Sequence, residues 1–218
     1  MELGLRGRRV AILATDGVEQ VELEEPRKAL DAAGAVTHLI APDEGSIQAM
    51  NHDEQGARIP VDRVLADVRP GDYDALLLPG GVANPDRLRM NERAVQFVRE
   101  FMLADKPVAA ICHAAWMLVE ANAVAGRTLT SWPSLQTDVR NAGGEWVDDE
   151  VRVDDRLITS RKPQDLPAFC AAIVKEFASA IEVDERLELV GEQSFPANDP
   201  PPGPSAIGGE GAAAGQPS

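Results

Sequence analysis

The chain has 218 residues, of which 44% are hydrophobic and 26% are charged, and its formal net charge is −15. This length suits one sizeable α/β domain, and no second domain of full size is expected. The acidic balance argues against nucleic acid and anionic lipid surfaces as partners, and it leaves the substrate open.

The cysteine count bears on the compartment. The only two cysteines are Cys112 and Cys170, and two thiols cannot build the disulfide framework of a small secreted domain. A reducing compartment, by default the cytoplasm, is therefore expected. The apolar run at residues 10–13 is too short for a signal-peptide core, and no stretch has the length to span a bilayer, so no membrane association is expected.

Short apolar runs alternate with helical periodicity along most of the chain. Such runs are typical of a parallel sheet that is buried on both faces, and the amphipathic segments between them are typical of covering helices. Residues 46–67 depart from this pattern and predict a turn at 51–56, with Pro60 interrupting a strand at 58–64. In chain order, strands are expected at 10–14, 36–40, 74–78, 108–111, 128–131, 150–153 and 157–160, and helices at 21–33, 91–104, from 114 onward, at 134–141 and at 163–178.

This alternation ends near residue 180. Residues 1–180 are therefore assigned to one α/β domain, and residues 181–218 to an acidic tail rich in Pro, Gly and Ala. From about residue 195 the tail cannot bury enough apolar surface to fold, so disorder is expected there.

Three loops that contain reactive side chains or glycines follow the ends of predicted strands. They contain residues 16–20, residues 79–81, and Cys112 with His113. The carboxyl ends of parallel strands meet at one edge of a sheet, and ligands bind beyond that edge. The pattern therefore predicts that the three loops converge on one site.

Cys112 stands between an apolar strand and the start of a helical pattern. At such a position the free backbone N–H groups and the helix dipole favour a thiolate. An arbitrary cysteine is more often an inert core residue, and Cys170 fits that description because it lies in the apolar stripe of the last helix. The turn position and the adjacent His113 favour a nucleophile for Cys112.

The groups that would assist this thiol are less clear from spacing. Gly80 and Gly81 could bring backbone N–H groups to an oxyanion, although a tight turn explains them equally well. Glu19 could bond the thiol or transfer protons. Other acids near the same helix start share its position, so spacing alone leaves that choice open.

The positions of the histidines limit the catalytic mechanisms that are open to Cys112. No histidine follows His113, so the α/β-hydrolase, papain-like and glutamine amidotransferase arrangements lack their base. His38 and His52 are expected to be structural or solvated. No cluster of further ligands accompanies Cys112 and His113, so no metal site is expected.

Together these motifs resemble the PfpI family, which belongs to the superfamily of intracellular cysteine proteases, glyoxalases and proposed deglycases. The resemblance spans about residues 9–177 and rests on residues 10–23, 78–81, 110–113, 141–146 and 159–163. It implies a flavodoxin-like three-layer α/β sandwich with a mostly parallel sheet and a small β-hairpin extension. It also implies a homodimer or homohexamer and a place in the stress response.

The resemblance further implies roles for individual residues. Cys112 matches the nucleophile, Glu19 the buried acid that hydrogen-bonds it, and His113 the histidine that follows it. Gly81 and the backbone of His113 match the oxyanion donors, beside Gly80.

Three more positions follow from the same resemblance. Asp86 lies in the loop that, in protease members of the family, supplies an acidic residue to the catalytic histidine of a neighbouring subunit. An active site of this kind would need an oligomer. Ala114 stands where the family often has Gly, and its methyl group could narrow the approach to the thiol. Trp116 could shape the pocket or belong to the core.

Three functions compete under this resemblance. The first is cofactor-independent conversion of 2-oxoaldehydes such as methylglyoxal to lactate, or deglycation, through a hemithioacetal on Cys112. The second is peptide hydrolysis by Cys112, His113 and a neighbour's Asp86. The third is a redox sensor or holdase that is read out through oxidation of Cys112. We favour the first, with a small aldehyde or a glycated substrate, over the peptide substrate of the second.

Overall fold

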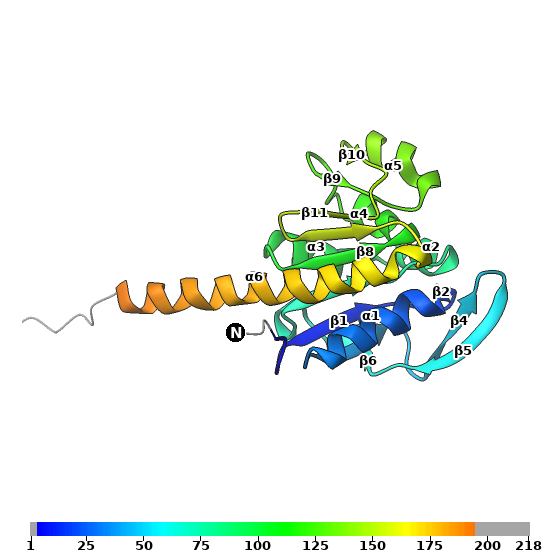
Figure 1. Cartoon of the computed structure of the whole chain (residues 1–218). Coiled ribbons are helices and arrows are strands. Elements are labelled where there is room, and N and C mark those ends of the chain that lie inside the picture. The colour runs from blue at the N-terminus through cyan, green and yellow to red at the C-terminus, as the bar shows by residue number, and fades with distance from the viewer. Residues whose placement is uncertain (1–3, 195–218) are drawn as a thin grey trace, which may run out of the picture.

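A central sheet lies between two groups of helices in the computed structural model, which describes residues 4–194 (Figure 1). Its seven strands have the order β11-β12-β8-β7-β1-β3-β6. All neighbours run parallel except β11, which is antiparallel to β12. The predicted three-layer α/β sandwich with a mostly parallel sheet is therefore confirmed. The strands are β1 (Arg9–Leu13), β3 (Val36–Ala41), β6 (Arg63–Val64), β7 (Ala75–Leu78), β8 (Val108–Ile111), β11 (Val151–Asp154) and β12 (Leu157–Ser160).

The two faces of the sheet bury two separate cores. In β1 the side chains of Val10 and Ile12 pack with α1 and α6, whereas those of Ala11 and Leu13 pack with α3 and α4. This division follows from the alternation of side chains along a strand, and both faces are apolar because both are covered. The helices are α1 (Gln20–Ala32), α2 (Ala83–Leu88), α3 (Glu92–Leu103), α4 (Ala115–Glu120), α5 (Gln136–Asn141) and α6 (Leu166–Ser194).

Two smaller sheets lie beside the central one. β2 (Val18–Glu19) pairs with β4 (Ser46–Asn51), which forms an antiparallel hairpin with β5 (Glu54–Pro60). This hairpin extends from the body next to the start of α1 (Figure 1). β9 (Thr128–Leu129) pairs in parallel with β10 (Glu145–Trp146). The turn expected at 51–56 is the tip of the β4–β5 hairpin.

Two helices differ from the sequence-based expectation. α2 was expected to be a loop, but Asn84 and Pro85 are buried and help to fix this short helix. α6 was expected to end near residue 178 and instead continues to Ser194. An ion pair between Arg156 and Asp184 at 2.7 Å, and a second between Arg8 and Glu185, tie its extension to the body. Residues 195–218 of the expected tail lie outside the described residues.

Candidate active site

The candidate nucleophile lies at the turn between β8 and α4, as the sequence pattern indicates. Cys112 has a φ angle of 63°, which is a left-handed conformation that costs a non-glycine residue about 1–3 kcal/mol. Its carbonyl oxygen accepts the N–H of Trp132 at 3.2 Å. Cys112 also begins a short 3-10 turn, residues Cys112–Ala114, that leads into α4. The strained turn places the sulfur at the carboxyl edge of the sheet, where the loop after β7 also ends.

The carboxyl group next to this sulfur belongs to Glu22, in the first turn of α1. Glu22 is fully buried, and its carboxyl group lies against the Cys112 thiol and the backbone N–H groups of Gly80 and Gly81. Neither oxygen has a hydrogen-bond partner of regular geometry in the described part of the chain. Burial raises the pKa of this carboxyl group to about 8. Glu22 is therefore protonated at neutral pH and can donate to the sulfur.

Burial also raises the pKa of the Cys112 thiol, and the charge of an ionised Glu22 would raise it further. The backbone N–H groups of His113 and Gly81 act in the opposite direction. A protonated Glu22 removes the repulsion and supplies one more donor. An ionised sulfur at this position consequently depends on Glu22 keeping its proton.

Glu19, which the resemblance placed at the thiol, lies elsewhere. Its carboxyl group accepts the backbone N–H of His52 at 3.0 Å and stands 3.9 Å from the ring nitrogen Nδ1 of the same residue. The physical reason is that Glu19 ends β2, whose pairing with β4 turns its side chain toward the hairpin, whereas Glu22 is one helical turn further on. The assignment of the thiol-contacting acid is thus corrected from Glu19 to Glu22.

His113 contacts the sulfur directly. Its Nδ1 atom lies 3.2 Å from the Cys112 sulfur, and burial lowers the pKa of the imidazole. The ring stacks on Trp132, with 5.6 Å between ring centroids, and meets Trp116 edge-on at 5.2 Å. Because it is enclosed by two indoles, His113 is neutral at pH 7 and fixed in orientation.

Trp132 was missed by the sequence analysis, which singled out Trp116. Trp116 donates its indole N–H to Asp138 at 3.0 Å and supports His113 from behind. Trp132 is 37% exposed and lines the pocket above the sulfur. The signal that could have found it is its position after the strand predicted at 128–131, in a connection that leads to a helix.

Steric constraints at the site require glycine at positions 80 and 81, after β7. A Cβ atom on Gly80 would lie 2.6 Å from the Cβ atom of Cys112 and 2.8 Å from the carbonyl oxygen of Ile111, and would also meet the Glu22 carboxylate. Gly81 has a φ angle of 82°, which favours glycine. The N–H groups of Gly81 and His113 both reach the sulfur, so they stand where an oxyanion formed on a thiol adduct would develop.

Two further expected site residues lie outside this cluster in the protomer. Ala114 is buried in the 3-10 turn and does not line the pocket. Asp86 is exposed on α2 and does not line it either. Asp86 is therefore available to a second molecule rather than to the Cys112 of its own chain.

The Cys112 pocket has a volume of about 340 Å³. Its walls come from the loop after β1, the start of α1, the tip of the β4–β5 hairpin, the loop after β7 and the turn before α6. The lining residues are Gly17, Glu19, Glu22, Met50, His52, Asp53, Gly81, Val82, Ala83, Cys112, His113, Trp132, Pro163 and Gln164. The predicted convergence of three loops at one edge of the sheet agrees with this lining.

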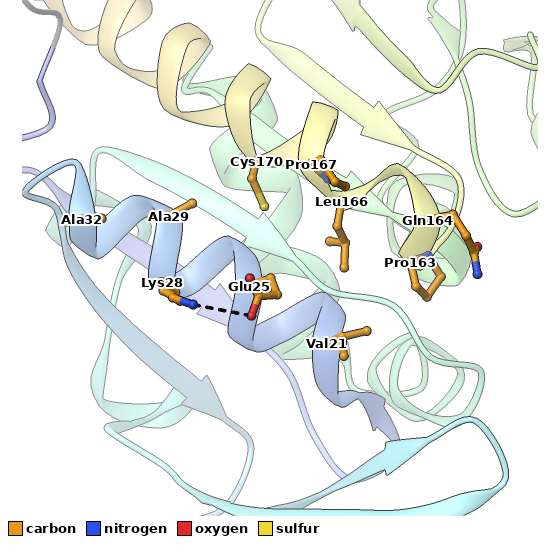
Figure 2. A pocket seen from close by; sticks show the side chains of 10 residues that line it. All are labelled: Val21, Glu25, Lys28, Ala29, Ala32, Pro163, Gln164, Leu166, Pro167 and Cys170. Atoms are coloured by element: carbon orange, nitrogen blue, oxygen red, sulfur yellow. Dashed lines mark ion pairs between the residues drawn. The ribbon is translucent and has the colours of Figure 1, made fainter.

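A second cavity of about 710 Å³ lies between α1 and the start of α6 and shares Pro163 and Gln164 with the first. Figure 2 shows Cys170 on its wall, with an ion pair between Lys28 and Glu25 at 4.0 Å on the rim. Burial raises the pKa of the Cys170 thiol to about 11. Cys170 is half-buried, and no histidine of the described residues lines its cavity, whereas His113 contacts the sulfur of Cys112; Cys170 is therefore assigned to the core rather than to a second nucleophile.

The described residues contain no group of three or more His, Cys, Asp and Glu side chains placed to hold a metal ion. Among residues 4–194, no helix combines the length and the apolar character that a membrane crossing requires.

The chain is similar to known proteins over most of its length. The DJ-1/PfpI family model matches residues 8–176. General stress protein 18 of Bacillus subtilis is 42% identical over 164 residues, which is 75% of this chain and 94% of that protein. Protein/nucleic acid deglycase 2 of Escherichia coli is 42% identical over 163 residues, 74% of this chain and 93% of that protein.

Solved structures agree with the sequence comparison. The crystal structure of Drosophila melanogaster DJ-1beta matches with a TM-score of 0.72 and 26% identity, over 84% of this chain and 97% of that chain. The flavodoxin-like fold expected from the resemblance is thereby confirmed. The chain belongs to the DJ-1/PfpI family and is an enzyme of that family.

Proposed function

We propose that the protein is a cofactor-independent enzyme that converts 2-oxoaldehydes such as methylglyoxal to 2-hydroxy acids. One observation carries the proposal: the Cys112 sulfur lies between the Glu22 carboxyl group and the Nδ1 atom of His113, at the base of an open pocket. This is the arrangement that a thiol nucleophile with adjacent proton-transfer groups needs.

The reaction begins with addition of the Cys112 sulfur to the aldehyde carbon. The new C–S bond gives a hemithioacetal, whose oxygen takes up a proton within reach of the N–H groups of Gly81 and His113. The hydrogen on the former aldehyde carbon then leaves as a proton, and a proton is added at the neighbouring keto carbon. The hydroxyl of the former aldehyde carbon loses its proton and becomes the thioester carbonyl, while the former keto oxygen gains a proton and becomes the 2-hydroxyl group. The product is the thioester of a 2-hydroxy acid, so no external oxidant or reductant is needed.

Water then cleaves the thioester to release lactate, and the thiol is restored. Glu22 and His113 are the two groups placed to carry these protons. Glu22 takes the part that the sequence analysis gave to Glu19, because it is protonated at neutral pH and contacts the sulfur. Removal of a glyoxal adduct from an amine would use the same sulfur, and the relative named a deglycase supports that extension.

Purified protein supplied with methylglyoxal should produce lactate, measured enzymatically or by proton NMR. The Cys112→Ser variant should have no activity. Lactate production that survives this substitution would exclude the mechanism. The Cys170→Ser variant is the matched control, because it removes the other thiol and leaves the pocket residues unchanged.

Peptide hydrolysis is the second candidate, and the exposure of Asp86 on α2 is the observation in its favour. It requires a homodimer or homohexamer in which the partner's Asp86 reaches His113. Peptidase activity that disappears in both Cys112→Ala and Asp86→Asn, together with an oligomer in light scattering, would establish this activity instead.

The proposal places the enzyme in the cytoplasm. Cys112 and Cys170 are both free thiols, and free thiols persist in a reducing compartment. Fractionation with an antibody against the native protein tests this assignment.

A further inference from the structure

The tip of the β4–β5 hairpin forms part of the wall of the Cys112 pocket. His52 and Asp53 make up this tip, and both line the same cavity as Cys112, as does Met50 at the end of β4. The side chain of His52 is 78% exposed. An imidazole that the sequence indicated to be merely solvated therefore stands at the mouth of the candidate active site.

Glu19 fixes this tip. Glu19 is nearly buried, at 8% exposure, and its carboxyl group accepts the backbone N–H of His52 at 3.0 Å. The second oxygen lies 3.9 Å from the His52 ring. His52 itself has a φ angle of 58°, a conformation that a non-glycine residue keeps only when its surroundings hold it. One buried carboxylate thus ties the end of the hairpin to the start of α1.

The pocket is larger than a three-carbon aldehyde requires. A volume of about 340 Å³ falls in the range of roughly 300–1,000 Å³ that is typical of sites for drug-sized ligands. A methylglyoxal unit bonded to the sulfur at the base occupies only the inner end. The outer end, bounded by His52 and Asp53, remains for whatever the 2-oxoaldehyde carbon chain is attached to.

We propose that the hairpin tip is the specificity wall of the enzyme, that His52 contacts the substituent of the substrate, and that Glu19 is the positioning residue that holds His52 there. This inference rests on the proposed aldehyde chemistry and deepens it. It assigns the enzyme to 2-oxoaldehydes whose substituent is larger than a methyl group, rather than to methylglyoxal alone. Phenylglyoxal is a convenient probe of this class.

The test compares kcat/KM for phenylglyoxal with kcat/KM for methylglyoxal. His52→Ala should lower both values, and should lower the ratio of the phenylglyoxal value to the methylglyoxal value about tenfold, as loss of a pocket contact does. Glu19→Ala should lower the same ratio and accelerate hydrogen exchange at the His52 amide. Glu19→Gln retains an oxygen acceptor for that amide and should recover most of the ratio.

Glu54→Ala is the matched control, because Glu54 follows the tip in sequence and does not line the pocket. An unchanged ratio in His52→Ala would overturn the specificity wall. A ratio that falls in His52→Ala but not in Glu19→Ala would overturn the positioning role. An equal fall in Glu54→Ala would attribute the effect to the hairpin in general and also overturn the proposal.

Failure of the aldehyde chemistry is distinguishable from failure of this inference. If the wild-type protein converts neither aldehyde, the proposed function is wrong. The tip is then tested by alkylation of Cys112 with iodoacetamide and with the bulkier N-phenylmaleimide, mapped by mass spectrometry. His52→Ala should change the ratio of the alkylation rates of the two reagents. An unchanged ratio would contradict the proposal that the hairpin tip is a wall of the site.

Discussion

The Glu22→Leu substitution tests the central contact of the site, because it removes the carboxyl donor and keeps a side chain of similar size. Glu22 is fully buried against the sulfur. A hydrogen bond to a charged group contributes about 1.5–3 kcal/mol. One pKa unit corresponds to about 1.4 kcal/mol, so loss of the donor should raise the pKa of the Cys112 thiol by about 1–2 units. At a pH below that pKa, the thiolate fraction should fall about 10- to 100-fold.

Alkylation of Cys112 by iodoacetamide measures this fraction. The rate is followed from pH 6 upward, and mass spectrometry separates Cys112 from Cys170, which does not line the Cys112 pocket and serves as the internal reference. We expect Glu22→Leu to slow the reaction of Cys112 by the factor given above. Glu22→Gln keeps an N–H donor but has no acidic proton, so it should be alkylated faster than Glu22→Leu while aldehyde turnover is lost. Alkylation of Glu22→Leu at the wild-type rate would refute the reasoning.

Three further predictions concern stability. Burial raises the pKa of Glu22 from 4.5 to about 8, so the folded protein holds an extra proton between these values. The free energy of unfolding should then fall as the pH rises, by up to about 1.4 kcal/mol per pH unit. Urea midpoints measure this slope, and Glu22→Gln should reduce it. Gly80→Ala should lower the free energy of unfolding by about 1–3 kcal/mol and slow Cys112 alkylation, because the added Cβ atom would collide with the side chain of Cys112. An unchanged melting temperature would contradict this prediction. Phe169 is fully buried in the core, so Phe169→Ala should lower the free energy of unfolding, measured by denaturant titration, by about 3–5 kcal/mol. The alkylation rate of the folded protein should not change. A loss below about 1 kcal/mol would contradict the close packing of Phe169.

Local pattern in the sequence was sufficient for the sheet and the turn at Cys112. Runs such as residues 75–78 and 108–111 are apolar at every position, which only a strand covered on both faces requires. The residues that follow these strands therefore lie at one edge of the sheet, and they include Gly80, Gly81 and Cys112. The β4–β5 hairpin was likewise indicated by its turn residues.

The sequence did not determine which acid meets the sulfur. Glu19 and Glu22 stand three positions apart at the start of one helix, and both satisfy the same local preference for an acid there. The choice depends on the pairing of β2 with β4, which turns Glu19 to the hairpin, and on the tertiary contact of the first turn of α1 with Gly80 and Cys112. These are contacts between segments distant in the chain.

The same distinction explains the other differences. Trp132 reaches the pocket through the hydrogen bond from its N–H to the Cys112 carbonyl oxygen, and His52 reaches it through the pairing of β4 with β2. α6 continues to Ser194, and its extension forms ion pairs with Arg8 and Arg156. Hydrophobic periodicity and turn chemistry act over a few residues, so the sequence by itself determined the strands of the central sheet, most of the helices and the position of the nucleophile. The partners of that nucleophile, and the wall that faces it, were decided only when the tertiary structure brought separate elements together.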